Sequence, residues 1–332
     1  QMWIMTFHSF CDKVLRREAL HIGLDPKYKL MTEAENIQLL RKNLFKLDLN
    51  YFRPLGNPNK FLSGMLQHFS RLQDEDVAPN DYLKWLKKSD PDFEKWEELA
   101  KAYKAYDEIK VKENVLDFGD VIIKTLKLFR DRPNILKEYQ KQFKYVLIDE
   151  FQDTNYAQNE LAILLAGKQK NINVVGDDDQ SVYRFRGAAV SNIIQFRKSF
   201  PKTKVVVLTK NYRSTQEILD RSYDLIQHNN PDRLEVVEKI DKRLIAVNRL
   251  ASQSPSKKLD EEVEFVHADR VENESDRIAK KILELQKEDK YSFKDFAILV
   301  RANNHSEPIM RALGRNGIPF QFLGPGRLFK QS

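Results

Sequence analysis

Short β-rich runs alternate with helical stretches in the middle of the chain, and this alternation limits the possible folds more than any other feature. The β-rich runs occupy residues 145–148, 172–175 and 204–208, and helical patterns at residues 158–166 and 189–200 separate them. Strands that alternate with helices are typical of a parallel sheet covered by helices. The sequence therefore predicts an α/β fold in this region.

The flanking sequence extends this pattern in both directions. Residues 2–6 are predicted to be the end of a buried strand that leads into a helix, and residues 30–112 show charged, aromatic-bearing helical patterns without a convincing strand. We therefore expect a helical insertion there. A second α/β set follows the polar stretch 251–262, with predicted helices at 215–227, 275–286 and 306–316 and predicted strands at 263–267, 296–300 and 320–323.

Length and composition restrict the class of protein. A chain of 332 residues is longer than one hydrophobic core usually serves, so we expect at least two domains. Cys11 is the only cysteine, which excludes an internal disulfide and a cysteine-built zinc or iron–sulfur site. No apolar run reaches the length of a membrane span, and we expect a cytoplasmic protein. The net charge of +7 favours a polyanionic partner, although a lysine-rich proteome would give the same value.

An acidic pair, Asp149-Glu150, follows the first predicted strand of the middle region. In open α/β sheets, ligands bind beyond the carboxyl ends of the strands. A carboxylate at this position could hold Mg²⁺, and its neighbour could polarise the water that attacks a γ-phosphate. The alternative is that the pair only caps the next helix.

A second motif, residues 176–188, follows the next predicted strand. Its three consecutive aspartates lack the alternating spacing of a calcium loop, and Gln180 is suited to sensing a γ-phosphate and its attacking water. Tyr183, Phe185 and Arg186 interleave flat rings with a cation, as in surfaces that stack the bases of single strands. The same aromatic side chains could instead pack in the core.

Two further motifs lie at predicted junctions. At residues 211–214, Arg213 could reach across a cleft to a transferring phosphoryl group, and Tyr212 could stack on a base, or the segment could be a helix start capped by Ser214. Thr6 and His8 place a hydroxyl and an imidazole where a helix N-terminus could bind a backbone phosphate. Simple capping of that helix by Ser9 is the alternative.

In this order, the four motifs resemble those of the UvrD/Rep/PcrA family of superfamily-one DNA helicases. Residues 149–154 are similar to the family's Walker B motif, and residues 176–188 to its glutamine-containing motif. Residues 211–214 resemble the motif that opens its second RecA-like core, and residues 296–303 a strand of that core. Residues 117–120 resemble an Asp-Phe-Asp-Asp element.

The chain departs from the family pattern at two positions. Gly119 replaces an acidic residue, and Phe185 stands where the family often has tryptophan. Phenylalanine keeps the stacking face but loses area and the indole N–H, so we expect a weaker grip on a base.

The resemblance implies a role for each candidate residue. Asp149 would bind Mg²⁺, Glu150 would act as the catalytic base, and Gln180 would sense the γ-phosphate of ATP. Tyr212 would stack on adenine, and Arg213 would act as the arginine finger. The residues that would face single-stranded DNA are Thr6, His8, Tyr183, Phe185 and Arg186.

One family motif is missing from the sequence. No G-x-x-x-x-G-K-[Ser/Thr] loop, which cradles the β- and γ-phosphates, occurs in the chain. In the family this loop precedes the Thr-Phe-His-Ser element, so we expect the chain to be a fragment. The later family motifs would then lie downstream of it.

The resemblance implies an α/β fold with two incomplete RecA-like parallel-sheet cores and a helical insertion in the first. The predicted ranges are residues 1–29 and 113–208 for the first core, 30–112 for the insertion, and 209–332 for the N-terminal part of the second core.

The resemblance also implies an ATP- and Mg²⁺-dependent 3′–5′ DNA helicase and translocase, acting on single-stranded and partially duplex DNA. The isolated fragment is expected to be inactive. Two alternatives remain open: a helicase–nuclease subunit of the RecB or AddA type, and a non-catalytic remnant that binds single-stranded DNA. The first needs a downstream nuclease domain. The second predicts salt-sensitive binding without DNA-stimulated hydrolysis.

Overall fold

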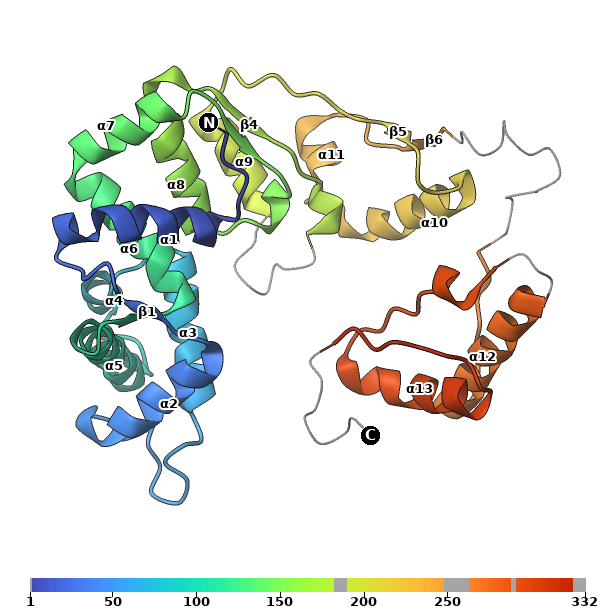
Figure 1. The fold of residues 1–332 in the computed structure, drawn as a ribbon, viewed down its shortest axis with the longest axis horizontal. Helices are drawn as coiled ribbons and strands as arrows, with labels where there is room; N and C mark the ends of the chain where they lie inside the picture. Colours follow the sequence, from blue (N-terminus) through green and yellow to red (C-terminus); the bar gives the residue numbers. More distant parts are fainter. Residues whose placement is uncertain (1, 182–189, 248–262, 288–290, 325–332) are drawn as a thin grey trace. The chain divides into compact units, whose positions relative to one another are not determined.

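The structure, a computed structural model, describes residues 2–181, 190–247, 263–287 and 291–324 (Figure 1). Its contacts divide the chain into two compact units. The first comprises residues 1–211 and 222–245, and the second comprises residues 212–221 and 246–332. Among the described residues, no helix has both the length and the apolar composition that crossing a membrane requires.

Four helices pack around the main core of the first unit: α1 (Phe7–Glu18), α6 (Phe118–Asp131), α7 (Pro133–Gln142) and α8 (Tyr156–Ala166). Each places a stripe of apolar side chains in this core, as amphipathic helices do. Leu15 of α1, Leu126 of α6 and Leu161 of α8 are fully buried there. The first helix begins where its prediction placed it.

The segment before α1 differs from its prediction. Residues 2–6 pair with no strand among the described residues. Instead, the Trp3 ring packs against the rings of Phe10 and Phe143, with centroids 6.2 and 5.0 Å away. Met2 and Ile4 are 76 and 83% exposed and Trp3 is only partly buried, so the prediction of a buried strand end is wrong for this segment. An apolar run predicts a buried strand only where a neighbouring strand pairs with it.

The region between residues 33 and 112 is helical where α-helices were predicted, and it has a core of its own. Its helices are α2 (Glu33–Asn43), α3 (Leu62–Asp74), α4 (Pro79–Trp85) and α5 (Phe93–Lys112). Phe69 of α3 stacks on Tyr103 and Tyr106 of α5. Two short parallel strands, β1 (Lys29–Leu30) and β2 (Val115–Leu116), flank these helices in sequence.

The predicted parallel sheet of the first unit is present as β3 (Val146–Ile148) and β4 (Ile172–Val174). The register pairs Val146 with Ile172 and Ile148 with Val174. Helices α8 and α9 (Val190–Ser199) pack with the sheet in a second apolar cluster, in which Phe151 contacts Phe196 edge-on. This arrangement confirms a parallel α/β sheet between residues 146 and 174.

The remaining elements are short or lie near the division between the units. They are α10 (Gln216–Ile226), α11 (Leu234–Glu238), the paired strands β5 (Lys210–Asn211) and β6 (Ile245–Ala246), and the 3₁₀ turns η1 (Ala19–Ile22), η2 (Leu44–Lys46), η3 (Phe151–Asp153), η4 (Gly167–Gln169), η5 (Asp178–Gln180), η7 (Gln227–Asn229), η8 (Phe293–Asp295) and η9 (Asn303–His305).

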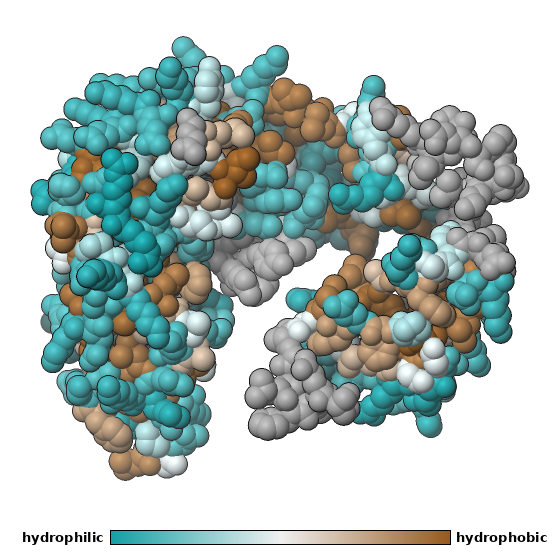
Figure 2. Space-filling view, viewed as in Figure 1, coloured by the Kyte–Doolittle hydropathy of each residue, from teal (hydrophilic) through white to brown (hydrophobic). Residues whose placement is uncertain are grey.

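In the second unit, α12 (Val271–Lys287) and α13 (Ser306–Arg315) confirm two predicted helices and share a small apolar core. Four predicted strands make no strand pairing among the described residues: 204–208 in the first unit, and 263–267, 296–300 and 320–323 in the second. A β-strand exists only in a ladder with a neighbour. Their apolar side chains stay accessible instead: Val206, Phe265 and Leu299 are 68, 91 and 94% exposed. Figure 2 shows such apolar surface as brown areas within a largely hydrophilic exterior.

Candidate functional site

The carboxyl ends of β3 and β4 lie side by side and form the frame of the site. Beyond the last paired residues, the Val175 N–H donates to the Ile148 carbonyl at 2.8 Å, and the Phe151 N–H donates to the Val175 carbonyl at 2.9 Å. The residues that follow each strand, Asp149-Glu150 and Gly176-Asp177, therefore meet at one sheet edge. This is the edge at which α/β sheets bind ligands.

Asp149 and Glu150 are both exposed at this edge. The Asp149 carboxylate accepts the Glu150 N–H at 3.0 Å. Glu150 has φ 50° and ψ 43°, a left-handed conformation that costs a residue with a side chain roughly 1–2 kcal/mol. Strained backbone of this kind is concentrated at functional sites.

The helix-capping alternative for the acidic pair is not what the structure shows. Glu150 precedes the 3₁₀ turn η3 without a capping hydrogen bond from its side chain. The next helix, α8, is capped by Asn155, which forms a capping box with Gln158. The two carboxylates therefore do not serve the end of α8.

Gln152 lies behind the acidic pair and is 1% exposed. Its Nε2 donates to the Glu150 carboxylate at 2.6 Å, and its Oε1 accepts the Asp177 N–H at 3.0 Å. A Cβ at Gly176 would lie 2.7 Å from that Oε1, so only glycine leaves room for this contact. The amide joins the ends of the two strands.

Gln180 is exposed on the turn η5 and is tied to the same edge. Its Nε2 donates to the Asp177 carboxylate at 2.9 Å. Glu150, Gln152, Asp177 and Gln180 thus form one hydrogen-bonded series. The structure brings together the acidic pair and the glutamine that the sequence singled out.

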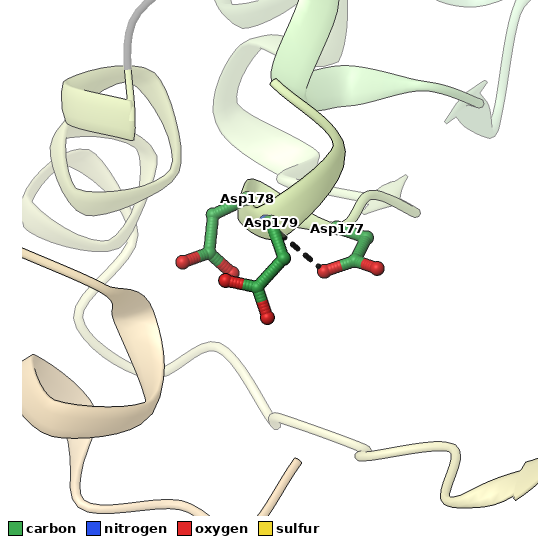
Figure 3. Close-up of side chains that lie close together, drawn as sticks. All are labelled: Asp177, Asp178 and Asp179. Atoms are coloured by element: carbon green, nitrogen blue, oxygen red, sulfur yellow. Dashed lines mark hydrogen bonds between the residues drawn. The ribbon is translucent and has the colours of Figure 1, made fainter. Parts of the chain in front are cut away.

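The three aspartates after β4 lie close together, with carboxylate oxygens within 4.8 Å of one another (Figure 3). Lys242 donates to all three, at 2.7 Å to Asp177, 2.5 Å to Asp178 and 3.0 Å to Asp179. Arg233 adds a bidentate pair to Asp179, with both distances 2.8 Å. The Lys242 ammonium group therefore lies among the carboxylates that could otherwise hold a cation.

These contacts shift the ionisation of the groups involved. Burial alone would raise the pKa of Asp179, but hydrogen bonds from Arg233 and Lys242 hold it below its usual range. Burial would likewise lower the pKa of Lys242, but the aspartates raise it. The pKa of Asp153, beside the acidic pair, is raised by burial and by the charge of Glu150.

Of the carboxylates at this edge, Asp149 is more accessible to a cation than the aspartate triplet, and it stays the candidate ligand for Mg²⁺. Mg²⁺ in nucleotide sites is usually held by one or two carboxylates together with phosphates and waters. Asp149 is an exposed carboxylate at the ligand-binding edge, whereas the triplet is occupied by Lys242 and Arg233. The residues present fit a nucleotide-bound Mg²⁺ at Asp149.

The N-terminal candidates lie at the start of α1. Thr6, not Ser9, caps this helix: its hydroxyl accepts the Ser9 N–H at 3.2 Å. His8 is half-buried, its ring meets the Phe118 ring edge-on, and burial lowers its pKa. Capping and phosphate contact use the same helix end, so the proposed DNA contact of Thr6 and His8 stays a prediction.

The remaining candidates either belong to the second unit or lie outside the described residues. Tyr183, Phe185 and Arg186 lie outside the described residues. Tyr212 is 62% exposed and Arg213 is exposed, and both are grouped with the second unit. The convergence of Arg213 on the acidic pair stays a prediction.

The Asp-Phe-Gly-Asp element is a buried charge cluster. Lys110 of α5 is fully buried and donates to the carboxylates of Asp117 and Asp120, each at 2.6 Å. Gln73 of α3 donates to the same two carboxylates at 3.1 and 2.9 Å. A Cβ at Gly119 would lie 2.2 Å from the Gln73 Oε1, so this amide takes the space that a side chain there would need.

Sequence reasoning missed Gln152, Arg233, Lys242 and Lys110. Gln152 belongs to the recognised motif at residues 149–154, and its position two residues after Glu150 is the only feature of the sequence that could have indicated their contact. Arg233 and Lys242 lie 54 and 63 residues from Asp179, and no local pattern links such positions. Lys110 looked like one more surface lysine on a charged helix.

Comparisons with known proteins show the family to which the chain belongs. Residues 1–201 match the UvrD/REP helicase N-terminal domain, and residues 206–332 match the UvrD-like helicase C-terminal domain. The ATP-dependent DNA helicase PcrA of Leuconostoc citreum is 33% identical over 332 residues, which cover 99% of this chain and 40% of that protein. The PcrA proteins of Staphylococcus epidermidis and Staphylococcus aureus are each 31% identical over 328 residues, covering 99% of this chain and 41% of theirs.

The chain therefore spans about 40% of the length of the curated relatives it matches. The N-terminal domain match alone includes more than half of the chain, and the two matches together extend to its last residue. The chain belongs to the UvrD/Rep family of helicases.

Proposed function

We propose that this chain supplies part of the ATP-hydrolysing motor of a 3′–5′ DNA helicase, built on two RecA-like cores and moving along single-stranded DNA. The observation that carries the proposal is the convergence of Asp149, Glu150 and Gln180 at one sheet edge, joined by hydrogen bonds through Gln152 and Asp177. Hydrolysis of a γ-phosphate needs a metal ligand, a base and a group that orients water.

Each residue has a defined task in this proposal. Asp149 holds Mg²⁺, which neutralises phosphate charge when it is bound with ATP. Glu150 accepts a proton from water as its oxygen attacks the γ-phosphorus and the bond to the bridging oxygen breaks, which gives ADP and phosphate. Gln180 contacts the γ-phosphate side of the site. Tyr212 stacks on adenine, and Arg213 stabilises charge on the transferring phosphoryl group.

The DNA-facing tasks are assigned to Thr6, His8, Tyr183, Phe185 and Arg186. Support comes from the position of Thr6 and His8 at the N-terminal end of α1, where backbone N–H groups favour anions. The expected substrates are single-stranded and partially duplex DNA. Because the chain has no phosphate-cradling loop, we expect hydrolysis only in the full-length protein.

The test is Glu150→Gln in the full-length protein. This change keeps the size of the side chain but removes the proton acceptor, so we expect nucleotide binding to persist while DNA-stimulated ATP turnover falls by about 100-fold or more. Turnover is measured with and without single-stranded DNA, and binding is measured with a fluorescent ATP analogue.

Glu138→Gln is the matched control, because Glu138 is an exposed carboxylate on α7. It should leave turnover unchanged. Unchanged turnover in Glu150→Gln would refute the base assignment. Tight binding of single-stranded DNA by a wild-type protein that hydrolyses no ATP would instead favour the non-catalytic remnant.

A further inference from the structure

Gln152 carries a buried amide between the acidic pair and the loop that carries Gln180. We propose that Gln152 is a positioning residue, which orients the Glu150 carboxylate and fixes it relative to the Gln180 loop. The proposal rests on the function proposed above and adds a residue to it. Gln152 itself is 1% exposed, so it acts through Glu150 and not on ATP.

The chemistry of its two partners determines the orientation of the amide. Only the amide oxygen can accept the Asp177 N–H, which lies 3.0 Å away. The NH₂ group must then face Glu150, where it donates to the carboxylate at 2.6 Å. A flipped amide would oppose N–H to NH₂ and oxygen to carboxylate, two repulsive contacts in a buried place. One orientation therefore satisfies both ends.

The surrounding backbone holds this amide in place. Its own backbone lies in the turn η3, where the Asp153 N–H donates to the Glu150 carbonyl at 2.9 Å. A Cβ at Gly176 would lie 2.7 Å from the Gln152 Oε1 and 3.2 Å from the Gln152 N. The amide thus packs directly against bare backbone, and it has little room to move.

The contact between Gln152 and Asp177 connects the proposed base, Glu150, with the proposed phosphate-sensing residue, Gln180. Asp177, whose N–H is held by Gln152, accepts the Gln180 side chain at 2.9 Å. A displacement of the Gln180 loop therefore moves the Asp177 N–H that donates to Gln152, and with it the amide group that orients Glu150. The base and the phosphate-sensing residue are coupled through one side chain.

A purely structural role is the competing explanation, in which Gln152 only satisfies the buried Asp177 N–H. The two roles differ in what a substitution changes. Loss of a structural contact lowers stability and affects substrate binding and turnover alike. Loss of a positioning contact lowers kcat and leaves KM for ATP unchanged, because the base acts only in the transition state.

The test uses Gln152→Leu and Gln152→Glu in the full-length protein. Gln152→Leu keeps much of the volume and removes both hydrogen bonds, so we expect kcat of the DNA-stimulated ATPase to fall roughly 10–100-fold, as on loss of an orienting partner, with KM unchanged. Gln158→Leu is the matched control, since this glutamine caps α8 without touching Glu150. It should retain kcat.

Gln152→Glu gives a second, independent readout. Its carboxylate can still accept the Asp177 N–H, but it cannot donate to the Glu150 carboxylate and repels it. The contact to the Gln180 loop is thus kept while the orienting donor is lost, so we expect kcat to fall as in Gln152→Leu, with KM for ATP unchanged.

The outcomes distinguish failure of the positioning role from failure of the proposed function. If Gln152→Leu keeps wild-type kcat, or loses kcat no more than Gln158→Leu does, the positioning role is refuted while a strong Glu150→Gln defect leaves the proposed function intact. If Gln152→Leu fails to fold, wild-type kcat in Gln152→Glu refutes the positioning role. If Glu150→Gln is fully active, the proposed function falls and the positioning role falls with it.

Discussion

At the scale of single residues, acidic side chains that could form a ligand site form ion pairs with basic side chains of the same chain. The three aspartates after β4 would suit a cation by composition, but Lys242 contacts all three and Arg233 pairs with Asp179. Arg233 is 3% exposed, so this pair is shielded from solvent. The segment that includes Arg233 and Lys242 is thereby fixed against the turn that carries Gln180.

This pairing predicts a pH-dependent effect of Asp179→Asn on stability. The pKa of Asp179 in the folded chain is below its unfolded value of about 4, so its stabilisation is present above that pH and is lost as the pH falls through the folded value. The variant should therefore unfold at lower urea than wild type at pH 7, and the difference should shrink below about pH 4.

Tryptophan fluorescence can follow this unfolding, because all three tryptophans, Trp3, Trp85 and Trp96, lie in the first unit. Asp232→Asn, the same change at an exposed neighbour of Arg233, is the control and should match wild type. A difference between Asp179→Asn and wild type that is equal at every pH would contradict the pairing.

At the scale of elements, the sequence predicted the helices and strands that depend on a pattern of neighbouring residues. β3 and β4, with the helices between and after them, follow from short apolar runs and from helical spacing, and both are present. The edge that carries Asp149, Glu150 and Gln180 follows from where those strands end. The predicted strands 263–267 and 296–300 are unpaired among the described residues, because composition does not show whether a partner strand lies alongside.

Contacts between distant elements could not be predicted in the same way. Thr6 rather than Ser9 caps α1, although both have a hydroxyl near the predicted start of the helix, because sequence does not show which of two nearby residues takes the capping position. The burial of Lys110 depends on α3, α5 and α6 meeting at one point, where Gln73 fills the place of a side chain at Gly119. A single sequence does not show that the side chain of one residue occupies the space left by another that is distant along the chain.

The buried cluster predicts a large effect of Lys110→Met. This change removes the cation between Asp117 and Asp120 and leaves their charges uncompensated in the interior. Breaking a buried ion pair in this way costs about 3–5 kcal/mol, and we expect a loss of that order in the free energy of unfolding. The measurement is urea unfolding of the first unit, followed by tryptophan fluorescence.

Two variants sharpen this test. Lys112→Met makes the same change at an exposed lysine of α5 and should leave stability nearly unchanged. Adding Asp117→Asn and Asp120→Asn to Lys110→Met should restore part of the loss, because no buried charge then lacks a partner. Equal stability of the Lys110→Met and Lys112→Met variants would argue against the cluster as a link between α5 and α6.

At the scale of the whole molecule, the positive charge fits the DNA partner that we propose. The net charge is +7, and single-stranded DNA is a polyanion that releases counterions when lysine and arginine side chains bind its phosphates. A lysine-rich composition without a binding surface would attract any polyanion weakly. The two explanations differ in how strongly binding discriminates between polymers.

We therefore predict salt-sensitive and selective binding of single-stranded DNA by this chain. Each phosphate contact contributes a slope of about 0.7 to the dependence of log affinity on log salt, so two or three contacts weaken binding roughly tenfold between about 50 and 200 mM salt. Fluorescence anisotropy of a labelled oligothymidylate measures the slope, and heparin serves as a competitor without bases. Stacking on aromatic side chains adds affinity that heparin cannot match. If heparin displaces the labelled oligonucleotide as well as unlabelled single-stranded DNA of the same total charge does, net charge alone explains the binding.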